Sequence, residues 1–528
     1  MPALPRREFL RRGIQLGSLA TGALAISLTL EGCNRSTPAS TTSTSTTLSS
    51  SPATSRDWTK LASSLRGTLV LPTSPAYGVD RLLYNSKFTH LHPQGIAYCA
   101  GADDVARCVS FATSHDLALA ARSGGHSYAG YSSCDGLVID VSRLAAISVD
   151  TAANTAKVGA GAQLIDVYNT IGSHGRLLPG GSCPTVGIAG LALGGGIGVF
   201  GRRYGLTCDN LRSIHLVTAD ARHVHADSGS HADLLWACQG GGGGNFAIAT
   251  SFEFEVHAMP EVTLFTLQYP WAAATTMLHA WQEWIGSTPD ELWSNCQLLS
   301  QGGYGYLAQV AGVYCGSPSA LASYLSSLRS AIATAPTYSF SGSNDYIRAM
   351  EIEAGCSGLT IAACHVTPES PHGALSRTSY AAKSSYVDGP MTPSQVSSII
   401  GAVERLSAEA PKLGGGLAFD SYGGAINAVK RDETAFVHRD KLACIQATYS
   451  WSPFSATSEI DAGARWLSWL GSDVFNPTTG AYQNYIDPTL AHWKSAYYGT
   501  NLERLVNVKK KYDPENRFRF AQSIPLTL

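Results

Sequence analysis

Apolar and polar positions change their spacing several times along the chain, and each change marks an expected element. Residues 103–115 place Val105, Cys108, Val109 and Ala112 on one helical face, which predicts an amphipathic helix. Residues 164–173 predict a second helix. Short apolar runs predict strands on both sides of a glycine-rich loop and then beyond it, at 117–122, 137–141, 147–149, 156–158, 211–218 and 252–256.

The pattern changes after about residue 260. A strand is expected over 265–269, a helix over 272–285 and successive strands over 297–314. Helical spacing returns at 317–332 and 392–407. These residues predict an antiparallel sheet with helices on one face, a plausible layer for binding a substrate. Together the two halves indicate an α+β fold.

The N-terminus is expected to be a targeting segment over residues 1–35. Residues 5–11 resemble a twin-arginine export signal and precede the apolar run 16–30. Residues 30–33 resemble a bacterial lipoprotein cleavage box with Cys33 as the lipidated residue. Glu31 is atypical there, so an ordinary signal peptide with an incidental Cys33 stays open. The Ser/Thr-rich segment 36–57 reads as a linker. We therefore expect an exported, extracytoplasmic protein, with Cys33 a candidate lipid anchor.

Composition narrows the expected partners. The 37 Lys and Arg nearly balance the 39 Asp and Glu, so no basic stripe for nucleic acid is expected. The 12 cysteines of an exported chain could form disulfides, and Cys356 and Cys364 are the nearest pair in the C-terminal half. No spacing typical of a metal site occurs, so no metal is expected.

Three glycine-rich segments, at residues 121–130, 181–198 and 239–248, allow the backbone to approach a ligand closely. None continues into the Lys-Ser/Thr of a P-loop, and none has the strand–helix setting of a Rossmann site. Successive N–H groups in the first segment could form an anion-binding nest. Nucleotide binding by another loop geometry is therefore the remaining expectation.

These three segments, in this order, resemble the FAD-binding domain of the vanillyl-alcohol-oxidase/p-cresol-methylhydroxylase (PCMH) superfamily. A C-terminal signature over 497–525 is similar to that of its berberine-bridge-enzyme-like branch, and the resemblance covers about residues 85–527. It implies a two-subdomain PCMH-type FAD-binding domain at 58–259 and a substrate domain at 260–480. Residues 481–528 would complete the FAD domain.

The resemblance also implies which residues hold the cofactor. FAD would be attached covalently to His126 and to Cys183. The other residues expected to contact FAD are Arg122, Ser123, Gly124, Gly125, Ser127, Gly187, Gly190, Gly194, Gly195, Gly196, Gly243, Asn245, Asn484 and Tyr485.

Catalytic roles follow from the same resemblance. Tyr485 would be the base, Asp420 its helper and Tyr128 a further residue of the site. A phenol with a pKa near 10 is a poor base at neutral pH, so a hydrogen-bonded carboxylate would have to draw its proton. Ile197 replaces a second active-site tyrosine of some relatives. Residues 425–429 carry no carboxylate, which disfavours the ring closure of alkaloid-forming relatives.

Three functions remain open at this point. Val186, three residues after Cys183, goes with oxidases among the relatives that the chain resembles, so an oxidase is favoured. It would transfer a hydride from a CH–OH group of a sugar, oligosaccharide or glycosylated metabolite to FAD, and then reduce O2 to H2O2. The alternatives are a dehydrogenase with another electron acceptor and a non-catalytic flavin-containing binding protein.

Overall fold

The computed structural model describes residues 53–367, 370–475 and 479–528. The expected export signal and Cys33 lie outside these residues and stay predictions. The first described helix, α2 (Ser55–Ser64), begins inside the segment expected to be linker. Thr54 and Asp57 form a capping box at its start, and this satisfies backbone N–H groups that would otherwise lack a partner. Among the residues described, no helix has the length and apolar character needed to cross a membrane.

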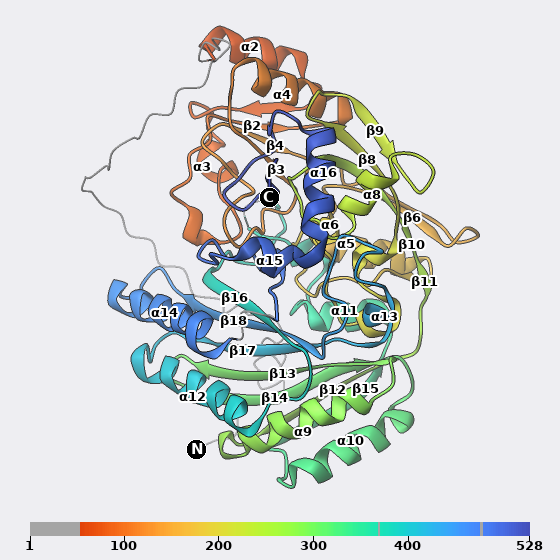
Figure 1. The fold of residues 1–528 in the computed structure, drawn as a ribbon, viewed down its shortest axis with the longest axis vertical. Coiled ribbons are helices and arrows are strands. Elements are labelled where there is room, and N and C mark those ends of the chain that lie inside the picture. The colour runs from red at the N-terminus through yellow and green to blue at the C-terminus, as the bar shows by residue number, and fades with distance from the viewer. Residues whose placement is uncertain (1–52, 368–369, 476–478) are drawn as a thin grey trace.

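The first half of the chain forms two small sheets (Figure 1). The first is mostly parallel, in the order β1 (Thr68–Val70), β2 (Gly95–Tyr98), β4 (Leu137–Asp140) and β3 (Leu119–Arg122). The second is antiparallel, in the order β5 (Ile147–Asp150), β6 (Thr155–Gly159), β10 (Ala247–Glu255), β8 (Leu211–Thr218) and β9 (His223–Ala226).

Two helices of this half confirm the sequence prediction. They are α4 (Ala102–Ser114), which buries the predicted apolar face, and α5 (Leu164–Ser173). Two further short strands, β7 (Arg176–Leu177) and β11 (His257–Ala258), pair with each other. The remaining helices here are short: α3 (Tyr77–Asp80), α6 (Ile188–Leu193), α7 (Gly201–Tyr204) and α8 (Ala232–Cys238).

The second half forms one seven-stranded antiparallel sheet, hereafter the large sheet, which confirms the predicted architecture. Its strands run in the order β15 (Tyr338–Asn344), β12 (Val262–Tyr269), β14 (Tyr306–Tyr314), β13 (Leu292–Gln301), β17 (Gly414–Ser421), β18 (Ala443–Trp451) and β16 (Ser379–Val387).

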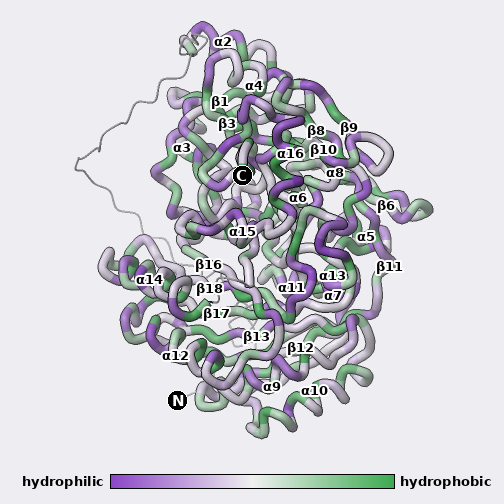
Figure 2. The backbone as a smooth tube through the Cα atoms, viewed as in Figure 1, coloured by the Kyte–Doolittle hydropathy of each residue, from purple (hydrophilic) through white to green (hydrophobic). Residues whose placement is uncertain are grey.

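Four helices cover the outer face of the large sheet (Figure 1). They are α9 (Ala274–Ser287), α10 (Pro318–Ile332), α12 (Pro393–Glu409) and α14 (Thr457–Trp469). Hydrophobic and hydrophilic positions alternate along them (Figure 2), and their apolar sides pack into a core that includes Trp281, Phe419 and Trp466. The inner face of the large sheet faces the first half of the molecule. The helices α11 (Tyr346–Glu353) and α13 (Gly424–Ala428) lie between the two in Figure 1.

The last residues return to the small sheets. The helices α15 (Trp493–Tyr498) and α16 (Leu502–Tyr512) lie beside them in Figure 1. The backbone N–H of Gly196 donates to the Tyr482 hydroxyl at 2.9 Å, across 286 residues of sequence. The N–H of Ile524 donates to Asn245 Oδ1 at 2.8 Å. The C-terminal segment is therefore an integral part of the first half of the molecule.

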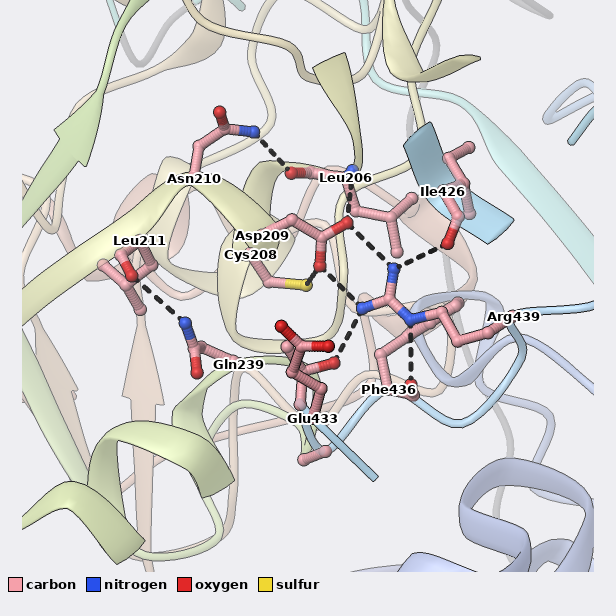
Figure 3. Close-up of polar contacts among 12 residues, drawn as sticks. Leu206, Cys208, Asp209, Asn210, Leu211, Gln239, Ile426, Glu433, Phe436 and Arg439 are labelled. Carbon is pink, nitrogen blue, oxygen red and sulfur yellow. Dashed lines mark hydrogen bonds and ion pairs between the residues drawn. The ribbon is translucent and has the colours of Figure 1, made fainter. Parts of the chain in front are cut away.

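A buried ion pair joins the two halves (Figure 3). Arg439 Nη1 and Nη2 donate to the two carboxylate oxygens of Asp209 at 2.8 and 2.6 Å. The remaining guanidinium N–H groups donate to the carbonyls of Phe436 and Ile426 and to the hydroxyl of Thr434. All five donors of an arginine are thus used, which compensates the loss of hydration. This arrangement also positions Phe436, whose ring lies 6.0 Å from that of Tyr482.

Replacing Arg439 by methionine should lower the free energy of unfolding by about 3–5 kcal/mol, because the Asp209 carboxylate stays buried without its partner. Urea unfolding followed by tryptophan fluorescence measures this. Arg431→Met is the matched control, since Arg431 pairs with Asp440 while more than half exposed (55%), and such pairs contribute about 0–1 kcal/mol. Equal losses in the two variants would contradict the structural role of the Arg439–Asp209 pair.

Candidate functional site

One cavity of about 800 Å³ runs from the loops of the small sheets to the inner face of the large sheet. Its wall includes β3 and the loop after it, residues 181–191, and residues 242–249. The opposite wall comes from β13, β17 and β18, and residues 482–486 close one side. Segments from three distant parts of the sequence therefore meet around one space, as ligand sites between structural units commonly do.

The two loops predicted to hold the cofactor covalently are packed backbone against backbone. A methyl group on Gly124 would lie 2.3 Å from the backbone nitrogen of Gly187, and the reverse substitution meets the same obstacle. No side chain fits there, so both positions require glycine. This contact brings the loops of His126 and Cys183 to the same cavity.

The His126 ring is held in one orientation. Its Nε2 is hydrogen-bonded to Thr185 Oγ1 at 2.8 Å, and the ring stacks on Tyr84 with centroids 3.9 Å apart. Burial lowers the pKa of His126 to about 3, so the imidazole is neutral. A neutral ring whose Nε2 is already bonded leaves Nδ1 as the nitrogen available to a cofactor.

Cys183 presents its thiol to the cavity. Burial, followed by the negative charge of Asp420, raises the pKa of the Cys183 thiol to about 11. The side chain is accessible from the cavity and forms no disulfide. The structure therefore brings the two predicted attachment residues together on one wall.

Gly190 and Gly243 form an open cradle on this wall. A methyl group on Gly190 would meet no protein atom within 4 Å, although Gly190 lies within α6 and lines the cavity. Gly243 has only one side-chain atom nearer than 4.0 Å, on Leu193. Gly125 adopts a φ of +68°, which favours glycine. These positions fit a large planar or phosphate-bearing group that approaches the backbone directly.

Gly194, Gly195 and Gly196, which the resemblance also places at the cofactor, pack against protein atoms. They are not part of the cavity wall in the described structure. Their missing side chains make room for protein atoms instead: added methyl groups would collide with Asn484, Phe436 and Thr207, at 1.9, 2.9 and 2.2 Å.

The other polar residues predicted to contact FAD mostly hold the loops in place. Arg122 forms a buried ion pair with Asp140, and Ser123 Oγ donates to the carbonyl of Ala160 at 2.7 Å. The remaining side chains make comparable local bonds: Ser127 accepts from the N–H of Tyr131, Asn245 donates to the carbonyls of Gly241 and Gly242, and Asn484 donates to the carbonyl of Leu191 and to Tyr482.

The three predicted catalytic side chains also line the cavity. Tyr485 stacks on Tyr128 with ring centroids 5.1 Å apart, and Gln446 Nε2 donates to the Tyr128 hydroxyl at 2.7 Å. Burial raises the pKa of Asp420 to about 7. Burial, then the charge of Asp420, raises the pKa of Tyr485 well above its usual value. Asp420 thus lies close enough to act on Tyr485, although no hydrogen bond joins them within the described residues.

Several cavity residues were missed by the sequence analysis. Glu353 ends α11 and faces the cavity, and burial followed by the charge of Asp420 raises its pKa to about 7. Asn295, Gln297 and Gln446 come from strands of the large sheet. No motif marks any of them, because they meet only through strand pairing and loop packing. Ile197 lines the cavity and packs against Tyr482.

The predicted disulfide candidates do bond: Cys356 and Cys364 form a disulfide. Within the described ranges, no group of three or more His, Cys, Asp or Glu side chains could hold a metal ion.

Comparison with known proteins supports a flavin in this cavity. Residues 93–227 match a family described as FAD binding domain, and residues 481–525 match one described as Berberine and berberine like. The first match includes His126 and Cys183, and the second includes Tyr485. The prediction of FAD as cofactor is thereby confirmed.

Relatives match nearly the whole chain. The uncharacterized FAD-linked oxidoreductase YgaK of Bacillus subtilis (strain 168) is 31% identical over 466 residues, which are 87% of this chain and 97% of the relative. A chitooligosaccharide oxidase of Gibberella zeae is 30% identical over 85% of this chain and 91% of the relative. The solved structure of Physcomitrella patens BBE-like 1 superposes with a TM-score of 0.80 at 30% identity, over 89% of this chain and 99% of that one.

Replacing Gly190 by alanine tests whether this position is glycine because the cofactor approaches it or because of packing within the protein. The added methyl group meets no protein atom, and alanine favours a helix over glycine by roughly 1 kcal/mol, so the fold should be at least as stable. The variant should nevertheless carry less flavin per chain, measured by visible absorbance after purification. Gly401→Ala, in α12 and equally free of contacts, is the control and should retain full flavin. Full flavin in both variants would contradict the cradle.

Proposed function

Because the chain belongs to the berberine-bridge-enzyme-like family of FAD-linked oxidoreductases, we propose that it is an oxidase of sugars. Its substrate would be a CH–OH group of a sugar, oligosaccharide or glycosylated metabolite, and its electron acceptor O2, which becomes H2O2. FAD would be bound covalently through His126 and Cys183. The observation that carries this proposal is that one cavity joins these two side chains to the polar inner face of the large sheet.

The polar face supports a hydroxyl-rich substrate. Gln297 of β13 and Gln446 of β18 line the cavity in the same row of the large sheet, on either side of Ala418 of β17. Thr448 and Ser450 follow on β18. Gln297 Oε1 accepts from Gln309 at 3.4 Å, and Gln309 Oε1 from Gln268 at 2.9 Å, so the amides form a chain across the sheet. Neutral donors and acceptors of this kind suit sugar hydroxyls. The activity named for the chitooligosaccharide oxidase relative is consistent with this choice.

FAD, when bound, supplies the hydride acceptor for the oxidation. The protein has to remove the hydroxyl proton of the substrate. Burial keeps Tyr485 protonated, so its phenol oxygen can take this proton only as its own proton leaves. In our proposal ionised Asp420 receives that proton. Tyr128 has its hydroxyl engaged by Gln446 and would position the ring of Tyr485 by stacking.

Val186 supports O2 as the electron acceptor, because this small side chain lines the cavity close to Cys183. A dehydrogenase with another acceptor is the second candidate function. Measuring oxygen uptake while a substrate is oxidised distinguishes the oxidase from the dehydrogenase.

The purified protein should keep its flavin after denaturation. A sugar that is a substrate should bleach the flavin, and the oxygen consumed during turnover should equal the peroxide formed.

Tyr485→Phe should retain attached flavin but reduce it about 10²–10⁴-fold more slowly, which is the range for losing a general base. Stopped-flow absorbance measures this rate. Tyr306→Phe, on an exposed side chain (36%), serves as the control. Dye reduction by sugar without oxygen uptake would favour the dehydrogenase, and an unchanged rate in Tyr485→Phe would remove the base assignment.

The rate of flavin reduction should rise as pH increases through about 7. The pKa of Asp420 is raised to about 7, so its carboxyl group is protonated and unable to accept a proton below that pH, and ionised above it. Asp420→Asn should lower the rate and remove this rise. Glu353 titrates in the same range, so the profile is also measured in Glu353→Gln, where the rise should persist. A profile that is flat in the wild type would contradict the role of Asp420.

A further inference from the structure

Two carboxylates without protein partners face the same end of the cavity. Glu353 is the last residue of α11, and Asp420 lies near the end of β17. In the described part of the chain neither carboxylate takes part in a hydrogen bond or an ion pair. Burial, followed by the negative charge of Asp420, raises the pKa of Glu353 to about 7, and burial raises the pKa of Asp420 to about 7. No described protein group contacts either carboxyl group, so a cation bound between them would favour their ionised forms.

The position of Glu353 is fixed by its surroundings. The residues that follow it, Ala354, Cys356 and Cys364, form a small buried cluster with Ile165 of α5. The disulfide between Cys356 and Cys364 closes the segment. Glu353 is thus held where the chain is covalently restrained, which is unlike a charged residue at a solvated helix end.

A third acceptor lies beside Asp420. Asn295 is directly opposite Asp420 in the pairing of β13 with β17. Asn295 is only 8% exposed, lines the cavity, and its Oδ1 has no hydrogen-bond partner in the described structure. Buried polar atoms are normally hydrogen-bonded, so an unpaired one on a cavity wall points to a ligand.

We propose that Glu353, Asp420 and Asn295 form an amine pocket that binds a protonated primary amine of the substrate. An ammonium group has three N–H donors and one positive charge, and the pocket offers three acceptors and negative charge. The preferred substrates are therefore amino sugars or amine-bearing glycosides rather than neutral or anionic sugars. This inference rests on the proposed function for the substrate class, and the amine is bound there without itself being oxidised.

The two arginines of the cavity wall do not compete for this pocket. Arg122 comes from β3 and forms its ion pair with Asp140, and Arg519 comes from the C-terminal segment. Neither is on the large sheet or on α11. The carboxylates proposed to select the substrate therefore lie on different elements from the two arginines of the cavity wall.

Binding to the holoenzyme tests the amine pocket without turnover. Glucosamine oligomers, the matching glucose oligomers and the N-acetylated oligomers are titrated anaerobically by calorimetry into the wild type. The free amines should bind at least about tenfold more tightly than either neutral series, which corresponds to one good charge-assisted contact. Equal affinities in the wild type would overturn the proposal without need of any variant.

Glu353→Gln keeps the shape of the side chain and removes its charge. It should reduce the ratio of amine to neutral affinity about tenfold. Glu351→Gln is the matched control on the same helix, because Glu351 pairs with Arg348 and is not part of the cavity wall. It should leave the ratio unchanged, and an equal fall in both variants would overturn the assignment to Glu353.

Flavin reduction by the same compounds distinguishes this inference from the proposed function. An amine preference that depends on Glu353, with no sugar reducing the flavin, would support the pocket and refute the sugar oxidase. Reduction by neutral sugars with no amine preference would support the oxidase and refute the pocket.

Discussion

The contact between the backbones of Gly124 and Gly187 is the constraint on which the cofactor side depends. A methyl group on Gly124 would lie 2.3 Å from the opposing nitrogen, so the two loops can approach this closely only with glycine at both positions. This contact between the loops determines how His126 and Cys183 lie relative to each other. Thr185, in the second loop, then fixes the ring of His126 in the first. The placement of His126 and Cys183, the predicted attachment residues, therefore depends on the contact between the two loop backbones.

The elements best predicted from sequence are those whose own residues decide their structure. The helix α5 begins and ends where its apolar spacing predicted, at Leu164 and Ser173. The strand β17 was missed because it starts with Gly414, Gly415 and Gly416, residues that favour turns. It is a strand because β13 and β18 supply its hydrogen bonds on both sides. Tertiary pairing overrides local preference there, and this pairing is also what brings Asp420 to the cavity.

The glycine runs show a second limit of sequence reasoning. A run of glycines indicates that something approaches the backbone, without indicating what. Gly190 faces open cavity, whereas Gly194 faces the side chain of Asn484, 290 positions later in the chain. Family motifs led to the prediction of His126, Cys183 and Tyr485, since these lie inside the motifs, and all three line the cavity. Glu353 and Asn295 lie in none, and only the folded chain brings them beside Asp420.

The return of the C-terminal segment has a consequence for the order in which the site is assembled. Tyr482, Asn484 and Ile524 bond to Gly196, Leu191 and Asn245, groups synthesised hundreds of residues earlier. During translation the cofactor loops exist for a long interval without the residues that close one side of the cavity. The complete wall of the cavity therefore exists only after the last residues have been synthesised and have folded back onto the earlier loops.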